Sequence, residues 1–207
     1  SSTAAVYGTP VAMPITEDHQ KHPESPYGES KLMVEKILGW LQQLNDLHFV
    51  ALRYFNASGA SLDASIGERH DPETHIIPNV IRAALNKSTF RLFGNDYDTP
   101  DGTCIRDYIH VLDLCEAHVV SLEKLWKDGG MGIYNVGTGK GYSNKEIVEM
   151  VKKISRVDFA VEFAERRPGD PNQLIADASK IKAELGFSPK HSELETIVRT
   201  AWEWHKK

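Results

Sequence analysis

Long hydrophobic runs are absent from this sequence of 207 residues, and cysteine and net positive charge are scarce. No apolar stretch approaches the roughly 20 residues that a membrane span needs, so we expect no membrane partner. The net charge of −5 argues against nucleic acid and anionic membranes as partners. The two cysteines, Cys104 and Cys115, are too few for a disulfide scaffold and favour a reducing, cytoplasmic location.

The sequence also lacks the G-x-x-G-x-x-G turn with which a dinucleotide-binding half holds pyrophosphate. Its one glycine cluster, Gly137-Thr138-Gly139-Lys140-Gly141, has a different spacing. Two histidines, His70 and His75, are conceivable metal ligands, but no third ligand stands at a suitable spacing in the sequence. We therefore predict that the protein has no metal site.

A tyrosine and a lysine four residues apart, Tyr27 and Lys31, stand near the start of the chain. Ser25 and Pro26 just before them are typical of a helix start, a hydroxyl N-cap followed by proline at the first helical position. The sequence thus predicts a helix over residues 26–44 with Tyr27 and Lys31 on one face. An ammonium one turn away favours the phenolate form of a tyrosine, which can then act as a general base.

The segment Ser1–Gly8, with the sequence SSTAAVYG, reads as the end of a strand and the loop after it. Together with the tyrosine and lysine pair, it resembles the UDP-glucose (UDP-galactose) 4-epimerase family of the extended short-chain dehydrogenase/reductases, and the resemblance extends over essentially the whole chain. The resemblance implies that Tyr27 and Lys31 are catalytic and that Thr3 supplies a helper hydroxyl.

The resemblance further implies a reaction and a cofactor. The reaction is epimerisation of a UDP-hexose at C4 through a transient 4-keto sugar, with NAD as cofactor. Tyr27 would take the C4 hydroxyl proton, Lys31 would stabilise the phenolate and orient the nicotinamide ribose, and the hydride would leave one face of C4 and return to the other.

Residues later in the chain complete the implied site. His48–Asn56 reads as a buried strand ending in polar residues, and open α/β sheets bind ligands at the carboxyl ends of their strands. The cofactor would be contacted by Tyr54 and Phe55 in addition to Thr3, Tyr27 and Lys31. The UDP-sugar would be contacted by Asn56, His75, Ile76, Arg91, Phe93, Arg106, Arg167, Asp170 and Leu174.

Three of these residues have more specific implied roles. Arg106 and Arg167 would clamp the diphosphate, because a guanidinium fork suits phosphate geometry. Leu174 would stand where bulk limits the substituent at C2 of the sugar, so we expect some activity on N-acetylated UDP-hexosamines.

The resemblance implies an α/β fold, namely the C-terminal part of a Rossmann-type parallel sheet plus a smaller mixed α/β substrate-binding domain. We expect residues 1–56 to be the remainder of the NAD-binding domain. Residues 57–207 would be mainly substrate domain, with a return to the sheet around residues 103–139. In the resembled family the glycine-rich turn precedes the segment that corresponds to Ser1–Gly8, which we call the serine-rich turn. We therefore interpret the chain as a C-terminal fragment that is inactive alone.

Local signals predict further elements and contacts. Asp113 fits the N-cap of a helix that ends near Trp126, which would bury Cys115. Ser143 and Glu146 fit a capping box for a helix to about Ile154.

The helix over residues 26–44 has two apolar stripes, although one is enough to pack against a sheet. The first stripe contains Tyr27, Val34, Leu38 and Leu41, and the second contains Met33, Ile37, Trp40 and Leu44. Two stripes indicate a second packed surface, and the resemblance implies that this surface is a homodimer interface.

Alternatives remain at this stage. Nucleotide-sugar 4,6-dehydratases place an acidic pair after the Thr of the serine-rich turn, whereas this chain has Ala4-Ala5, which disfavours dehydration. A UDP-uronate or UDP-N-acetylhexosamine 4-epimerase stays open. From another class, so does a non-catalytic sugar-nucleotide-binding fragment.

Overall fold

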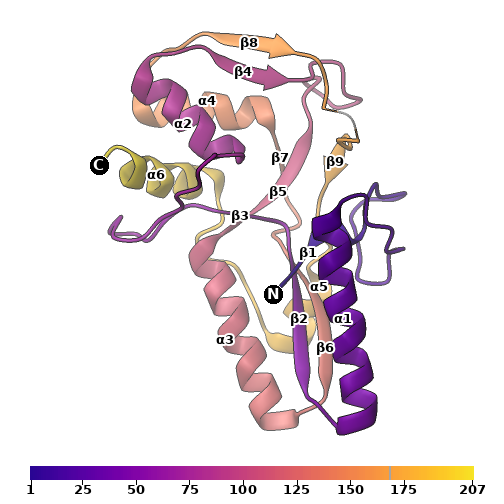
Figure 1. Ribbon diagram of the computed structural model, residues 1–207. Helices are drawn as coiled ribbons and strands as arrows, with labels where there is room; N and C mark the ends of the chain where they lie inside the picture. Colours follow the sequence, from indigo (N-terminus) through magenta and orange to yellow (C-terminus); the bar gives the residue numbers. More distant parts are fainter. Residues whose placement is uncertain (168) are drawn as a thin grey trace.

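A three-stranded parallel sheet in the order β1-β2-β6 forms one part of the molecule, with helices on both of its faces (Figure 1). The computed structural model describes residues 1–167 and 169–207. The strands are β1 (Ser2–Thr3), β2 (Phe49–Tyr54), β3 (Asn56–Ser58), β4 (Phe90–Phe93), β5 (Ile105–His110), β6 (Met131–Val136), β7 (Gly141–Ser143), β8 (Val161–Ala164) and β9 (Gln173–Leu174). The helices are the 3₁₀ turn η1 (Ala4–Val6), α1 (Pro26–Asn45), α2 (Ile76–Asn86), α3 (Val111–Asp128), α4 (Asn144–Ser155), α5 (Ser179–Leu185) and α6 (Leu194–His205).

Helix α1 begins as the sequence predicts. Ser25 is its N-cap, and the Ser25 hydroxyl accepts from the backbone N–H of Gly28 at 3.1 Å. The buried residues of the helix are Gly28, Leu32 and Glu35. Glu35 forms a buried ion pair with Arg53 of β2, with 2.6 Å between Oε2 and Nη2. Because this narrow face holds α1 on the sheet, most of both predicted apolar stripes is left exposed.

The strand predicted over residues 48–56 is divided in two, so the prediction of one continuous strand is wrong. β2 pairs with β6 in the first sheet, while β3 leaves that sheet and runs parallel to β5. β5 also pairs antiparallel with β7 and parallel with β9. Asn56 therefore lies where the chain crosses from one sheet to the next.

The remaining part of the molecule is built on α2, α4 and α6, whose apolar faces enclose one hydrophobic core that includes Ile77, Ile81, Ile147 and Ile197. The parallel pair β4-β8 lies beside these helices (Figure 1). Helix α4 begins with the predicted capping box of Ser143 and Glu146. The parallel sheets and flanking helices confirm the predicted α/β class. The domain division at residue 56 stays a prediction.

Two local predictions are wrong. Helix α3 begins at Val111 with His110 as its N-cap, and Asp113 is instead buried inside the first turn. There its carboxylate accepts from the backbone N–H groups of Lys190 and His191 and from the hydroxyl of Ser192. The Asp113 carboxylate therefore binds residues far along the chain and does not cap α3. Cys115, predicted to be buried, is exposed on α3.

Candidate active site

Two adjoining cavities meet where β3, β5 and the start of α2 come together. The larger has a volume of about 590 Å³ and the smaller about 340 Å³. Both are lined by Asn56, His75, Ile76 and Tyr108. The point where the chain changes sheets thus stands at the junction of the two cavities.

The smaller cavity is lined by four of the residues predicted to act in catalysis or to contact the cofactor. They are Thr3, Tyr27, Tyr54 and Phe55. Helix α1 approaches the serine-rich turn so closely that a Cβ at Gly28 would lie 2.5 Å from the carbonyl oxygen of Ala5. This contact brings Tyr27 beside the turn that holds Thr3.

Lys31 and Tyr27 share one face of α1, as their spacing predicts. The Lys31 Nζ atom lies 5.9 Å from the centroid of the Tyr27 ring and donates to the carbonyl oxygen of Ser1 at 3.2 Å. The Thr3 Oγ1 atom accepts from the backbone N–H of Ala5 at 3.2 Å. The arrangement therefore offers a half-exposed phenol, a nearby ammonium and a hydroxyl at one end of the smaller cavity.

The larger cavity is strongly basic. Its lining includes the arginines Arg82, Arg91, Arg106 and Arg167 against one carboxylate, that of Asp170. The guanidinium carbon of Arg167 lies 4.5 Å from the centroid of the Phe93 ring, so the cation rests on the aromatic face. An excess of guanidinium groups in a concave site suits a phosphate ligand.

Asp170 is engaged within the protein. It pairs with Arg106, whose Nη2 atom also donates to the carbonyl oxygen of Pro171 at 2.8 Å. The hydroxyl of Tyr97 donates to Asp170 Oδ2 at 3.2 Å. Burial, reinforced by the charge of Asp170, raises the pKa of Tyr97 to about 12, so this phenol is a donor at neutral pH.

Leu174 lies outside the sets of described residues that line the two cavities. It packs against the cluster containing Val6, Ile15 and Phe55, the last of which is itself a predicted site residue. Pro168, inside the segment between Arg167 and Asp170, lies outside the described residues.

The glycine cluster at residues 137–141 has a structural role. The buried carboxylate of Asp107 accepts from the backbone N–H groups of Thr138, Gly139 and Ala176. A Cβ at Gly137 would lie 2.7 Å from Asp107 Oδ2. The turn is therefore glycine-rich because its backbone encloses an internal carboxylate, and no local sequence pattern indicates this partner.

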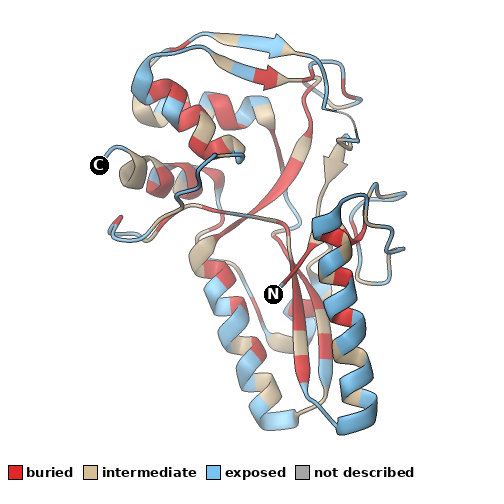
Figure 2. Ribbon diagram, viewed as in Figure 1, coloured by how far each residue is buried: buried red, intermediate tan, exposed pale blue. Residues whose placement is uncertain are grey.

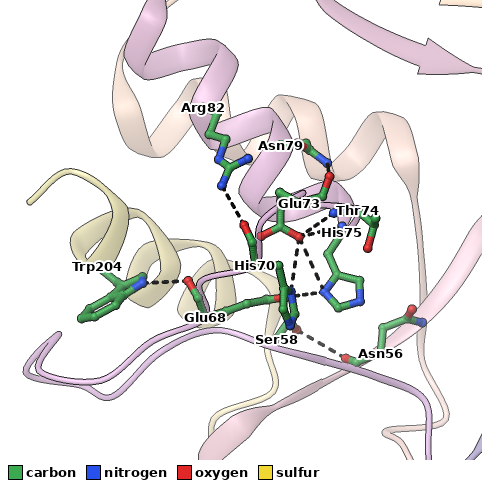
Figure 3. Close-up of polar contacts among 10 residues, drawn as sticks. All are labelled: Asn56, Ser58, Glu68, His70, Glu73, Thr74, His75, Asn79, Arg82 and Trp204. Atoms are coloured by element: carbon green, nitrogen blue, oxygen red, sulfur yellow. Dashed lines mark hydrogen bonds and ion pairs between the residues drawn. The ribbon is translucent and has the colours of Figure 1, made fainter.

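A second group that sequence reasoning missed lies in the loop before α2. Glu68 and Glu73 join His70 and His75 in one polar cluster beside both cavities (Figure 3). The premise that these histidines lack a third ligand is therefore wrong in three dimensions. The signal was nevertheless present in the sequence, because Glu68 stands two residues before His70 and Glu73 two residues before His75.

Across the described residues, no helix is both long enough and apolar enough to cross a membrane.

Comparisons with known proteins place this site in context. A family model described as GDP-mannose 4,6 dehydratase matches residues 1–200. The UDP-glucose 4-epimerase of Lactobacillus helveticus is 48% identical over 207 residues, covering 100% of this chain and 63% of that protein.

Two crystal structures show the same fold. The UDP-glucose 4-epimerase of Brucella ovis in complex with NAD matches with a TM-score of 0.94 and 46% identity, over 98% of this chain and 62% of that one. The enzyme of Bifidobacterium longum in complex with NAD⁺ and UDP matches with a TM-score of 0.91 and 37% identity, over 100% of this chain and 62% of that one. This chain thus spans somewhat less than two thirds of the length of these relatives.

Proposed function

The chain belongs to the family that the GDP-mannose 4,6 dehydratase model describes, and from this premise we propose that it carries the catalytic and sugar-nucleotide residues of an NAD-dependent UDP-hexose 4-epimerase acting on UDP-glucose and UDP-galactose. The observation that carries the proposal is the junction of the two cavities at Asn56 and His75. This junction connects the smaller cavity, which Tyr27 lines, to the larger, arginine-rich cavity. The names of the relatives support the same reaction.

The arginine-rich cavity would hold the UDP portion of the substrate. Arg91 and Arg167 line this cavity, and the buried Arg106 adds a third cation whose charge Asp170 partly balances. A nucleotide diphosphate bound there would place its sugar at the junction, beside Asn56. The amide of Asn56 already donates to the carbonyl oxygen of Asp107 at 2.8 Å, which fixes its orientation toward a ligand.

The smaller cavity would hold the sugar ring and the nicotinamide. Thr3, Tyr27, Tyr54 and Phe55 line it, and this mixture of hydroxyls and aromatic rings fits the nicotinamide end of NAD. When bound, NAD would supply the hydride acceptor and donor that inversion at a non-acidic carbinol requires. Tyr27 would remove the C4 hydroxyl proton, with the Thr3 hydroxyl bridging to the sugar. Lys31, whose Nζ atom lies 5.9 Å from the centroid of the Tyr27 ring, would orient the nicotinamide ribose.

Dehydration is the reaction named by the family model, but the residues here do not favour it. Ala4 and Ala5 follow Thr3, so the turn beside Tyr27 presents two methyl groups. A dehydratase needs an acid there to protonate a C6 leaving hydroxyl. For its proton transfers, epimerisation needs only the tyrosine base, because the proton taken from the C4 oxygen returns to that oxygen.

We further propose that the protein is a homodimer paired through α1 and located in the cytoplasm. Met33, Ile37, Trp40 and Leu44 are exposed apolar residues spaced along α1, a helix that is coloured as exposed over much of its length (Figure 2). Such apolar exposure is typical of an interface. Both cysteines carry free thiols, which suits a reducing compartment.

The substitution Tyr27→Phe in the full-length gene product tests the assignment of the base. We expect the rate of UDP-glucose to UDP-galactose conversion to fall by about 10²–10⁴-fold, with affinity for UDP unchanged because the arginine cavity is intact. Turnover at the unsubstituted rate in this variant would refute the assignment. Loss of UDP binding would show instead that the substitution disturbs the fold.

A further inference from the structure

The polar cluster in the loop between β3 and α2 contains two histidines and two glutamates. Their potential ligand atoms, on Glu68, His70, Glu73 and His75, all lie within 4.8 Å of one another. His70 Nδ1 is 2.9 Å from Glu68 Oε1 and 3.5 Å from Glu73 Oε1. His75 Nδ1 is 3.9 Å from Glu73 Oε1 and also contacts Glu68. In a tetrahedral zinc site, bonds of about 2.0–2.2 Å hold neighbouring ligand atoms roughly 3.3–3.6 Å apart, so the observed separations bracket that geometry.

Glu73 is the unusual member of the cluster, since its side chain is completely buried. Its Oε1 atom faces both imidazoles and accepts from the backbone N–H groups of Thr74 and His75 (Figure 3). Its Oε2 atom has no hydrogen-bond partner among the described residues. A buried carboxylate with an unpaired oxygen is costly without a compensating partner, which a bound cation would supply.

The backbone of the loop is held in place from outside the cluster. The indole N–H of Trp204 donates to the carbonyl oxygen of Glu68 at 2.9 Å. Arg82 donates to the carbonyl oxygen of His70 and Asn79 to that of Glu73, both at 3.3 Å (Figure 3). The loop also packs so closely on α6 that a Cβ at Gly67 would lie 2.3 Å from the Trp204 ring. The four side chains are thus presented by an anchored backbone, as a preformed site requires.

We propose that Glu68, His70, Glu73 and His75 bind one divalent transition-metal ion of the zinc class. Imidazole nitrogen and carboxylate oxygen are ligands that Zn²⁺ accepts, and two carboxylates balance its charge. Four protein ligands complete the tetrahedron, so the ion has no open position for chemistry. It fastens the loop to the start of α2 at the rim of both cavities, which His75 lines.

The test is calorimetric titration of the full chain with ZnCl₂ alone, with Co²⁺ as a spectroscopic probe of tetrahedral coordination. We expect one ion per chain and an intense visible Co²⁺ absorption band. Substitution of an outer partner of a metal ligand already costs about 10–100-fold in affinity. His70→Ala and Glu73→Gln remove ligands themselves, so each should weaken binding by at least about 100-fold.

The matched control is His22→Ala, which removes an exposed histidine far from the loop in sequence and should bind like the unsubstituted chain. Circular dichroism without metal checks that each variant is folded. The His70 side chain is half-exposed, so its variant tests the proposal even where Glu73→Gln unfolds. No zinc binding, unchanged affinity in either ligand variant, or an equal loss in the control would overturn the proposal.

Discussion

His110 is a single residue whose protonation should control stability. It is fully buried at the start of α3, where Nδ1 accepts from the backbone N–H of Leu112 at 3.1 Å and Nε2 lies 3.0 Å from Thr200 Oγ1. Burial lowers its pKa from 6.5 to about 4, and the neighbouring carboxylate of Asp113 only partly opposes the shift. The folded protein therefore holds this imidazole neutral at pH values at which the unfolded chain protonates it.

The sign of the pH effect follows from that difference. As the pH falls from about 6.5 toward about 4, the unfolded chain binds a proton that the folded chain rejects. His110 should then lower the free energy of unfolding by up to about 1.4 kcal/mol per pH unit. His110→Asn keeps an N-cap acceptor and removes this dependence. Urea unfolding of both proteins across the window measures the difference in slope, and equal slopes would contradict the account.

Which single residues could be predicted depended on the range of their contacts. Tyr27, Lys31 and Ser25 were placed correctly because helix geometry within one or two turns determines their relation. Asp113 was misassigned because its partners, Lys190 and His191, follow 77 and 78 residues later. No local pattern records such contacts.

At the scale of elements, the position of α1 should depend on Gly28. A Cβ there would lie 2.5 Å from the backbone oxygen of Ala5, whereas a Cβ at Gly39 in the same helix would meet nothing within 4 Å. Gly28→Ala should therefore push the helix from the serine-rich turn and destabilise the protein by about 1–3 kcal/mol. Gly39→Ala should stabilise it by about 0.5–1 kcal/mol, since alanine is the better helix former.

Chemical denaturation of the two variants beside the unsubstituted protein measures both changes. The account is contradicted if Gly28→Ala is as stable as Gly39→Ala. Activity provides a second comparison, because only Gly28→Ala should also displace Tyr27 and reduce activity in the full-length gene product.

The elements themselves were largely predictable from the sequence, but their pairing was not. Capping residues and helical spacing identified α1 and α4 close to their observed bounds. The break between β2 and β3 at Phe55 was missed, because the run from His48 to Asn56 contains no glycine or proline that would mark an interruption. The break exists because Asn56 pairs with Tyr108 rather than continuing along β6, a choice made by tertiary contacts.

At the scale of the whole molecule, α1 and α3 lie on either side of the parallel sheet (Figure 1), and both carry exposed apolar side chains. On α1 these include Ile37 and Trp40, and on α3 they include Leu122 and Trp126. We predict that pairing through α1 holds the dimer, so Ile37→Glu combined with Trp40→Glu should shift the full-length gene product from dimer to monomer in sedimentation. Leu122→Glu combined with Trp126→Glu is the matched comparison and should leave the dimer intact. A monomer produced only by the α3 variant would show that the interface lies on α3, which would contradict the prediction.

The central claim for the whole molecule is that these residues invert a sugar at C4 by transient oxidation. The most direct measurement is to incubate the full-length gene product with UDP-glucose in D₂O and to follow the C4 position by NMR. The account predicts that UDP-galactose forms with its C4 hydrogen retained, because the hydrogen leaves and returns without exchange with water. Deuterium at C4, or a dehydrated product in place of UDP-galactose, would contradict it.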